Sequence, residues 1–285
     1  QSGYEWEADQ RHAEILIREM GLTADSKSVV CPGRKLTQKE LEESEEAEAS
    51  PEDTTRFRAL VARANFLSMD RPDISFAVKE LCRGMSNPLA ADWKALKHLV
   101  RYLVGKPRAI WHFHWQARPE YLTTLTDSDW AGCVKTRKST SGGVIFRGDH
   151  AIKHWSVTQS VIALSSAEAE LIALVKGGAE SLGLRSLSRD FGTACKIDIG
   201  VDASAAIGVV RRQGVGRVRH LDVRFLWVQE RVRSGDFTIR KVAGTENPAD
   251  LFTKHLGSDQ VHAALTDMNV MFAEGRAISA PCIAR

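Results

Sequence analysis

The chain has 285 residues, of which 43% are hydrophobic and 26% charged, and these proportions are typical of a globular protein. No apolar run approaches the ~20 residues that a membrane-spanning helix needs, so a membrane is not an expected partner. The net charge of +3 is too small to identify a partner, and five cysteines without C-x-x-C spacing predict reduced thiols in an intracellular protein.

The N-terminal part, residues 1–115, is predicted to be mainly helical. It begins with Gln1 and not with Met, which predicts a piece of a longer protein. Apolar residues at helical spacing indicate four helices, and the last three begin near Ser50, near Asp73 as a candidate cap, and near Asp92. An acidic stretch within 36–53 is predicted to be a solvated linker or an exposed helix.

After Pro107 the pattern changes to short strands. The alternating segment "AIWHFHW" is followed by three strands, "YLTTLTD", "SGGVIF" and "AIKHWSV", and then by a long helix from Ser165 to about Arg189. A strand ending at Asp202, two helices, the strand "DFTIRKVAG" and a short helix near "NPADLFTK" complete the order. Strands mixed with helices in this way predict an α/β fold with one central sheet.

Four acidic residues occupy strand ends and helix starts, which meet at one edge of such a sheet. Asp127 and Asp202 end strands, Glu170 lies in the first turns of the long helix, and Asp250 opens the last short helix. A few carboxylates suit a hard divalent ion such as Mg²⁺. Taken singly, Asp202 and Asp250 are equally well explained as helix caps and Glu170 as a surface residue.

Ordered motifs resemble a known family. The segments "TDSDWAG", "RKSTSGGVIF", "SSAEAELIALV", "VDASAAI" and "ENPADLFTK" resemble the ribonuclease H domain of copia-type LTR-retrotransposon Pol polyproteins. The stretch from "TTRFRALV" to "VRYLVGK" resembles the C-terminal part of the same family's reverse transcriptase, past the palm. The resemblance implies a thumb- or connection-like segment at 1–115, a ribonuclease H domain at 120–256 with a five-stranded mixed sheet flanked by helices, and a C-terminal tail at 257–285.

The resemblance also implies an activity, which is metal-dependent hydrolysis of the RNA strand of an RNA–DNA hybrid. The family's four acids fall on Asp127, Glu170, Asp202 and Asp250, with Glu168 as the competing choice for the glutamate. They would hold two Mg²⁺ ions, for which Mn²⁺ can substitute, ~4 Å apart. Asp129 is expected to be a turn or cap residue.

Contacts to the nucleic-acid backbone are expected from two polar, basic segments. The candidates are Arg137, Lys138, Ser139 and Thr140 on the first turn, and Arg211, Arg212, Arg217, Arg219 and His220 after the Asp202 helix. Trp155 and Trp227 are expected in the core and not as stacking platforms for bases.

Several departures from an intact polymerase leave alternatives open. No palm motif of the Y-x-D-D type is present, so the chain is not expected to polymerise DNA and its expected partner is the rest of a Pol polyprotein, namely the palm and an integrase. The implied location is cytoplasmic, in a virus-like particle, or nuclear. "AGTENPAD" is short and lacks the histidine that cellular ribonucleases H carry there. A degenerate copy that binds nucleic acid without cutting is the main alternative, and an integrase or transposase is disfavoured by the order of the acids.

Overall fold

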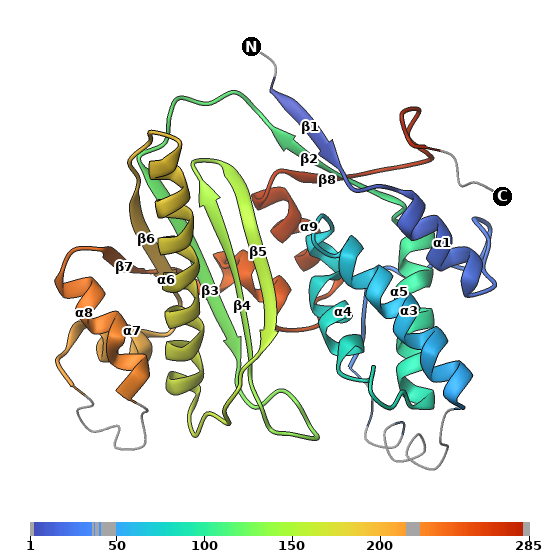
Figure 1. Cartoon of the computed structure of the whole chain (residues 1–285), viewed down its shortest axis with the longest axis horizontal. Coiled ribbons are helices and arrows are strands. Elements are labelled where there is room, and N and C mark those ends of the chain that lie inside the picture. Colours follow the sequence, from blue (N-terminus) through green and yellow to red (C-terminus); the bar gives the residue numbers. More distant parts are fainter. Residues whose placement is uncertain (1–2, 36, 38–39, 41–49, 215–222, 282–285) are drawn as a thin grey trace. The chain divides into compact units, whose positions relative to one another are not determined.

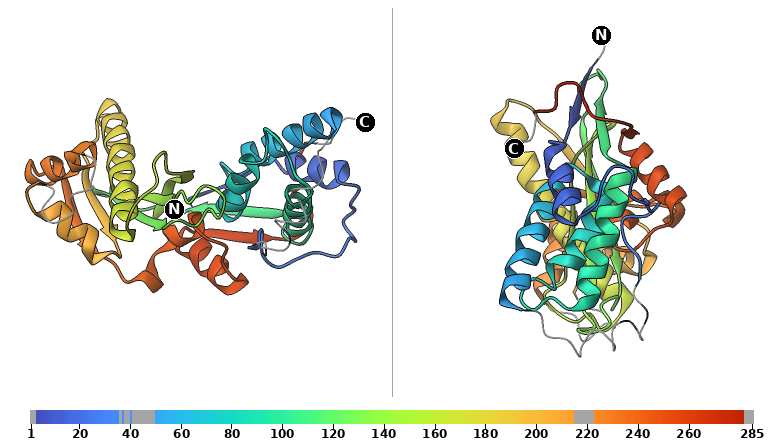
Figure 2. Two further views of the ribbon diagram at one scale, coloured as in Figure 1. Left: turned by 90° about the horizontal axis from the view of Figure 1, so that it is seen from below. Right: turned by 90° about the vertical axis from the view of Figure 1, so that its right-hand side faces the viewer.

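The computed structural model describes residues 3–35, 37, 40, 50–214 and 223–281. The chain forms two compact units. One unit consists of residues 114–254, and the other combines the described parts of 2–113 and 255–285. Each unit is described by itself below (Figures 1 and 2).

A mixed five-stranded sheet forms the centre of the 114–254 unit. Its strands are β3 (Tyr121–Asp129), β4 (Thr140–Arg147), β5 (His150–Thr158), β6 (Lys196–Val201) and β7 (Phe237–Lys241), in the spatial order β5-β4-β3-β6-β7. β4 is antiparallel to β3 and β5, whereas β3, β6 and β7 run parallel to one another. With helices flanking it, this sheet confirms the predicted ribonuclease H-like α/β fold.

The helices of this unit follow from the crossovers that parallel strands need. α6 (Ser166–Asp190) lies across the sheet and connects β5 to β6, and α7 (Ser204–Arg211) and α8 (Trp227–Arg233) lie between β6 and β7 (Figure 1). Short 3₁₀ turns precede α8 (η2, Val223–Leu226) and follow β7 (η3, Gly244–Glu246, and η4, Pro248–Phe252). The helix predicted over "HLDVRFLWVQERVRSG" is thus a 3₁₀ turn followed by α8, and its first residues lie outside the described part.

The core of the 114–254 unit lies between the sheet and these helices. Ile197, Ile199 and Val201 of β6 pack with Leu171 and Leu174 of α6. Trp155 is buried, as predicted, and Trp227 packs at the edge of this cluster with its ring tilted against Phe237. These contacts hold the N-terminal turns of α6 over the ends of β3 and β6.

The first strand is longer than the sequence indicates. β3 extends to Asp129, which pairs with Thr140 of β4, so the prediction that Asp129 lies in a turn beyond the strand is wrong. The Asp129 carboxylate leans over Gly132, where a Cβ atom would lie 1.7 Å from its Oδ2 atom. The missing side chain at Gly132 therefore makes room for the Asp129 carboxylate.

The second unit combines helices with a small sheet. The antiparallel strands are β1 (Tyr4–Glu7), β2 (Arg108–Phe113) and β8 (Val270–Ala273). The helices are α1 (Arg11–Glu19), α3 (Pro51–Leu67), the 3₁₀ turn η1 (Pro72–Ile74), α4 (Ser75–Cys82), α5 (Ala90–Gly105) and α9 (Ser258–Asp267). The Ser50 hydroxyl caps α3 by accepting a hydrogen bond from the Asp53 amide, as predicted. α9 and β8 occupy the segment for which the sequence indicated only a tail, and most of the acidic stretch within 36–53 lies outside the described residues.

Asp73 does not cap α4, and that prediction is wrong. Its carboxylate is buried and accepts two hydrogen bonds from the buried Arg71 guanidinium, at 2.9 and 2.7 Å. The Tyr102 hydroxyl of α5 donates a third, at 2.9 Å. This group ties η1 to α5 inside the apolar core of the unit.

Within the described ranges, no helix is long and apolar enough to cross a membrane. Cys31, Cys82, Cys133 and Cys195 carry free thiols.

Candidate metal centre

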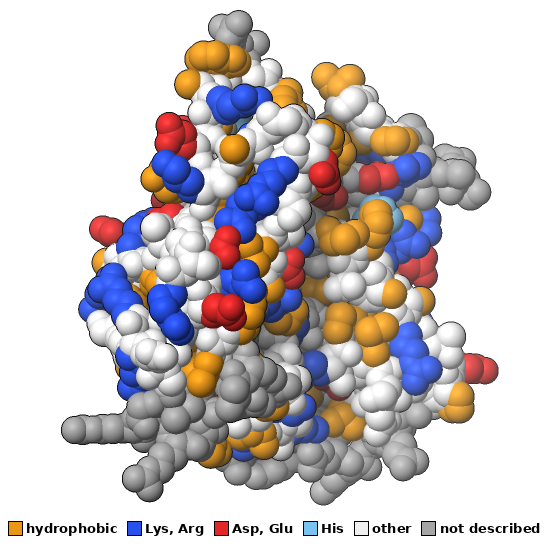
Figure 3. Space-filling model, turned by 60° about the vertical axis from the view of Figure 1, so that its left-hand side comes forward, with side chains coloured by type: hydrophobic (Ala, Val, Ile, Leu, Met, Phe, Trp, Pro, Cys, Tyr) orange, Lys and Arg blue, Asp and Glu red, His pale blue; other side chains and the backbone are white. Residues whose placement is uncertain are grey.

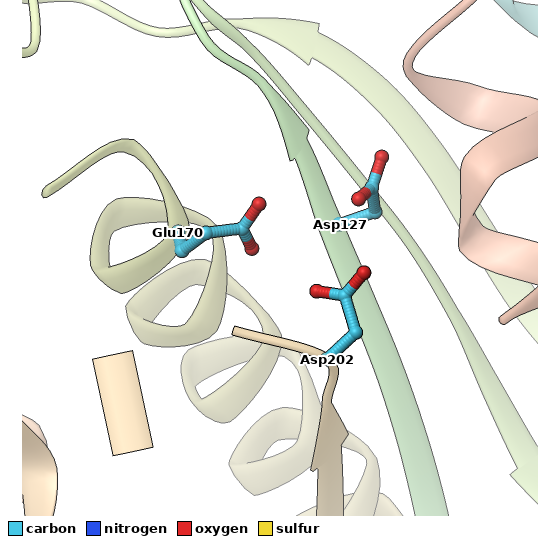
Figure 4. A group of neighbouring side chains, drawn as sticks. All are labelled: Asp127, Glu170 and Asp202. Atoms are coloured by element: carbon cyan, nitrogen blue, oxygen red, sulfur yellow. The ribbon is translucent and has the colours of Figure 1, made fainter. Parts of the chain in front are cut away.

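Three carboxylates from distant parts of the chain converge at one edge of the large sheet. Asp127 comes from β3, Glu170 from the N-terminal part of α6 and Asp202 from the residue after β6 (Figure 4). Each offers an oxygen atom, and these atoms lie within 4.8 Å of one another. The convergence follows from topology, because β3 and β6 are parallel neighbours whose carboxyl ends meet at the same edge.

The Glu170 carboxylate is buried, and only one of its two oxygens has a hydrogen-bond partner within the described residues. Its Oε1 atom accepts hydrogen bonds from the Ser128 amide at 3.2 Å and from the Ser128 hydroxyl at 3.0 Å. Its Oε2 atom is buried and has no hydrogen-bond partner. Burial, reinforced by the nearby Asp127 and Asp202 carboxylates, raises the pKa of Glu170 to about 8. Since a buried polar atom without a partner costs free energy, the donor set fits a divalent cation at this point.

Glu168, the competing glutamate, lies elsewhere and has a local role. Its amide donates to the hydroxyl of Ser165, the N-cap of α6, and its Oε2 atom accepts a 2.7 Å hydrogen bond from the Leu164 amide. This is a capping interaction at the start of α6. Of the two glutamates, Glu170 is the one that faces Asp127 and Asp202.

Asp250, the fourth predicted acid, lies beside this group on η4. Lys254 joins it to Asp127, because the Lys254 Nζ atom lies 3.0 Å from Asp250 Oδ1 and 3.7 Å from Asp127 Oδ2. Burial, followed by the charge of Asp127, raises the pKa of Asp250 to about 6, although Lys254 opposes this. Burial and Asp127 also raise the pKa of Asp202. Four acids therefore share one partly desolvated site.

The segment carrying Asp250 is attached to the sheet by side chains that the sequence-based prediction did not single out. The Asn247 side-chain amide donates to the Thr126 carbonyl at 3.0 Å, while its oxygen accepts from the Ala249 amide and caps η4. The Ser156 hydroxyl donates to the Phe252 carbonyl. The Thr253 hydroxyl is fully buried and donates to Asp127 Oδ2. The cap was readable in "NPAD", but the contacts with β3 and β5 depend on tertiary structure.

A glycine on β4 makes room for this attachment. A Cβ atom at Gly142 would lie 2.6 Å from Thr253 Cγ2, 2.8 Å from Phe252 Cβ and 3.0 Å from the Ala249 carbonyl oxygen. The last contact is with backbone, so a small side-chain rotation cannot relieve the clash. The side-chain-free position at Gly142 thus allows η4 to bring Asp250 to Asp127.

Replacing Gly142 with alanine is expected to destabilise the protein by about 2–3 kcal/mol, because it overpacks this contact and pushes η4 from the sheet. Urea unfolding measures the loss. The matched control is Gly183→Ala in α6, where a Cβ atom would meet nothing within 4 Å and helix propensity favours alanine. Equal stability of the two variants would contradict the tight packing of η4 against β4.

The acid cluster predicts a pH dependence of stability in the absence of metal. Glu170 has a pKa of about 8 in the folded protein against 4.5 as its ordinary value, so the folded state retains a proton that the unfolded chain releases between these values. Stability in EDTA is therefore expected to fall as the pH rises, by roughly 2–4 kcal/mol between pH 5 and pH 8. Denaturant unfolding at several pH values measures it, and Glu170→Gln should remove most of this slope. A slope unchanged by that substitution would assign the dependence to other groups.

The side chains predicted to contact nucleic acid differ in how exposed they are to solvent. Ser139 is fully buried, with its hydroxyl accepting from the Ala131 amide, and Thr140 is buried at the start of β4. The candidates on this turn therefore reduce to Arg137 and Lys138. Arg211 ends α7 and donates to the Ile239 carbonyl, with Arg212 next to it. Arg217, Arg219 and His220 lie outside the described residues.

Figure 3 shows no single dominant stripe of basic groups on the face that it draws. On the face seen in Figure 3, lysine and arginine side chains are scattered among acidic ones. Within the 114–254 unit, Lys153 and Lys176 both pair with Glu180, and Arg185 and Arg231 both pair with Asp236. Charge over this face therefore does not by itself define a nucleic-acid path.

Comparison with known proteins places the chain among transposon polyproteins. It is 34% identical over 186 residues to a retrovirus-related Pol polyprotein from transposon TNT 1-94 of Nicotiana tabacum. The aligned region covers 65% of this chain and 14% of that protein. It is 29% identical over 212 residues to the Pol polyprotein from transposon RE2 of Arabidopsis thaliana, covering 72% of this chain and again 14% of that protein. The chain thus spans about one seventh of the length of these relatives.

Among solved structures, the chain is similar to ribonuclease H1 from the archaeon Halobacterium salinarum, with 19% sequence identity and a TM-score of 0.31. The superposition covers 52% of this chain and 98% of the ribonuclease H1 chain. No protein-family model matches the chain.

Proposed function

Since the chain belongs to the Pol polyproteins of copia-type retrotransposons, we propose that its 114–254 unit hydrolyses the RNA strand of RNA–DNA hybrids with the aid of divalent metal ions. The observation that carries the proposal is the meeting of Asp127, Glu170 and Asp202, with a buried Glu170 oxygen that has no partner. Hydrogen-bond donors or one basic side chain can compensate a single buried carboxylate. Three carboxylates that converge carry more negative charge, which a divalent cation balances.

Asp127, Glu170 and Asp202, with Asp250 beside them, are the residues that would hold two Mg²⁺ or Mn²⁺ ions. Such ions, when bound, activate a water molecule and stabilise the leaving oxygen in phosphodiester cleavage. The products would be a 3′-hydroxyl and a 5′-phosphate.

The chain's own groups orient these ligands. The Ser128 amide and hydroxyl hold Glu170 through Oε1 and leave its second oxygen directed to other partners. The Thr253 hydroxyl fixes Asp127 through Oδ2. Hydrogen bonds of this kind to metal-binding carboxylates set their orientation and raise metal affinity.

Substrate binding would use basic groups on two segments of this unit. Arg137 and Lys138, on the turn between β3 and β4, would neutralise backbone phosphates, and Arg211 and Arg212 would do so from the end of α7. Selection of a hybrid over duplex DNA would rest on 2′-hydroxyl contacts and groove shape. The rest of the Pol polyprotein, including its polymerase palm and integrase, is the proposed partner, in a cytoplasmic virus-like particle or in the nucleus.

The direct test incubates the full chain with a hybrid whose RNA strand is end-labelled, in Mg²⁺ or Mn²⁺. Shortened RNA, intact duplex DNA and no cleavage in EDTA are the expected results. Binding of the hybrid without cleavage would replace the proposal with a degenerate copy that binds nucleic acid, and cleavage of duplex DNA would reassign the substrate.

A further inference from the structure

A protein cation already lies against the acid cluster. The Lys254 ammonium is 3.0 Å from Asp250 Oδ1 and 3.7 Å from Asp127 Oδ2. Its charge opposes the burial that raises the pKa values of Asp250 and Asp202. Within the described residues, the other ion pairs of the 114–254 unit do not involve any of the four acids.

The position of Lys254 is defined by its backbone. Lys254 follows Thr253, which is fully buried and bonded to Asp127, and it lies four residues after Asp250, one turn along the same segment. Its amide donates to the Asp250 carbonyl. The Lys254 side chain itself is 44% exposed, so a change of rotamer can move its ammonium away from the carboxylates into solvent.

The cluster therefore has two unlike sides. On one side, Asp127, Glu170 and Asp202 gather oxygens within 4.8 Å, and Glu170 Oε2 has no protein partner. On the other side, Asp127 and Asp250 are bridged by the ammonium, and the contacts made by Thr253 and Lys254 fall on the same Asp127 oxygen, Oδ2. A cation entering the first side lies among carboxylate oxygens and the Ser128 hydroxyl, whereas a cation entering the second side also meets the Lys254 ammonium directly.

We propose that Lys254 is a built-in counter-ion that holds the Asp127–Asp250 side of the cluster in the metal-free protein, and that a second divalent ion binds there only when the ammonium leaves. This inference rests on the proposed function, because it concerns how the same four acids take up metal. Lys254 is thus a positioning residue that makes the two metal-binding steps unequal. The acids are kept together before metal arrives, and the second ion binds more weakly than the carboxylates alone would allow.

The size of the effect follows from Coulomb's law. A unit charge and a divalent ion ~4 Å apart repel one another strongly enough, even at the dielectric constant of water, to change a dissociation constant by more than tenfold. Because the exposed ammonium can move away, we expect the lower end of this range, roughly a tenfold tightening of the weaker Mg²⁺ step when the charge is removed.

The experiment titrates Mg²⁺ into the 285-residue chain by isothermal calorimetry and compares wild type, Lys254→Met and Lys196→Met. Methionine keeps a similar length and removes the charge. Lys196 is the matched control, because it begins β6, at the end of the strand opposite to Asp202, and pairs loosely with Glu120 at 3.7 Å. Lys254→Met is expected to bind the second Mg²⁺ about tenfold more tightly and to melt at a lower temperature in EDTA, with Lys196→Met like wild type in both measurements.

A gain in affinity separates this proposal from a structural role, since a misfolded site can only lose metal. An unchanged or weakened Mg²⁺ affinity in Lys254→Met, with wild type still cutting the hybrid, would overturn the counter-ion role and leave the proposed function standing. Absence of Mg²⁺ binding by wild type would overturn the metal centre itself and the counter-ion role with it.

Discussion

Replacing Asp202 with asparagine is expected to lower Mg²⁺-dependent cleavage of hybrid RNA by at least a thousandfold, a loss of about 4 kcal/mol in transition-state stabilisation. Asparagine has the shape of aspartate but no charge, so it weakens a site that depends on converging carboxylates. Asp202 is only half-buried and follows a strand whose core contacts come from Ile197, Ile199 and Val201, so the fold should persist. Initial rates on an end-labelled hybrid, with circular dichroism as the check on folding, measure the effect.

The matched control for this variant is Glu168→Gln. Glu168 lies close to Glu170 in sequence, yet it caps α6 by accepting from the Leu164 amide. Its replacement is expected to leave the cleavage rate within a few-fold of wild type and to cost about 1 kcal/mol of stability as a weakened cap. Equal cleavage by wild type and Asp202→Asn would show that the site is misassigned, and loss of cleavage in Glu168→Gln alone would exchange the roles of the two glutamates.

The largest loss of stability is expected in the other unit, from Asp73→Ala, at about 3–5 kcal/mol. Arg71 is 2% exposed, and the substitution removes the carboxylate that receives two of its hydrogen bonds. The Tyr102 hydroxyl also loses its acceptor. Arg71 keeps its 3.0 Å hydrogen bond to the Lys106 carbonyl, but that bond carries no negative charge, so the buried guanidinium loses its counter-charge. Urea unfolding of the full chain measures the change.

A neighbouring aspartate is the control for this prediction. The Asp70 carboxylate accepts a 3.3 Å hydrogen bond from the exposed Trp6 indole, and the 2.7 Å bond from the Trp111 indole goes to the Asp70 backbone carbonyl, so Asp70→Ala is expected to cost less than about 1 kcal/mol. A double variant, Arg71→Met with Asp73→Leu, is expected to lose less stability than Asp73→Ala, because no buried charge is then left alone. If Asp73→Ala were as mild as Asp70→Ala, water or a rearranged Arg71 would have to be compensating the charge.

Local patterns in the sequence were sufficient for most of the secondary structure. The Ser50 cap, the long helix over α6 and the short strands β4 and β5 are encoded by residues that lie close together in the sequence. The failures occurred where a distant partner decides. Asp73 looks like a cap next to Pro72, but Arg71 and Tyr102 draw its carboxylate into the core. Asp129 looks like a turn residue, but pairing with Thr140 keeps it in β3.

By itself, the sequence determined the order of acidic residues, Asp127, Glu170, Asp202 and Asp250, along alternating strands and helices, and with it the expectation of a metal centre at a sheet edge. Only the tertiary structure decided that Glu170 faces Asp127 and Asp202 while Glu168 caps a helix, and that Lys254 reaches across two of the acids. The reason is physical. Periodicity and caps act over a few residues, whereas the charge and burial that a carboxylate experiences are set by side chains that the register of β3, β4 and β6 brings together from more than a hundred residues apart.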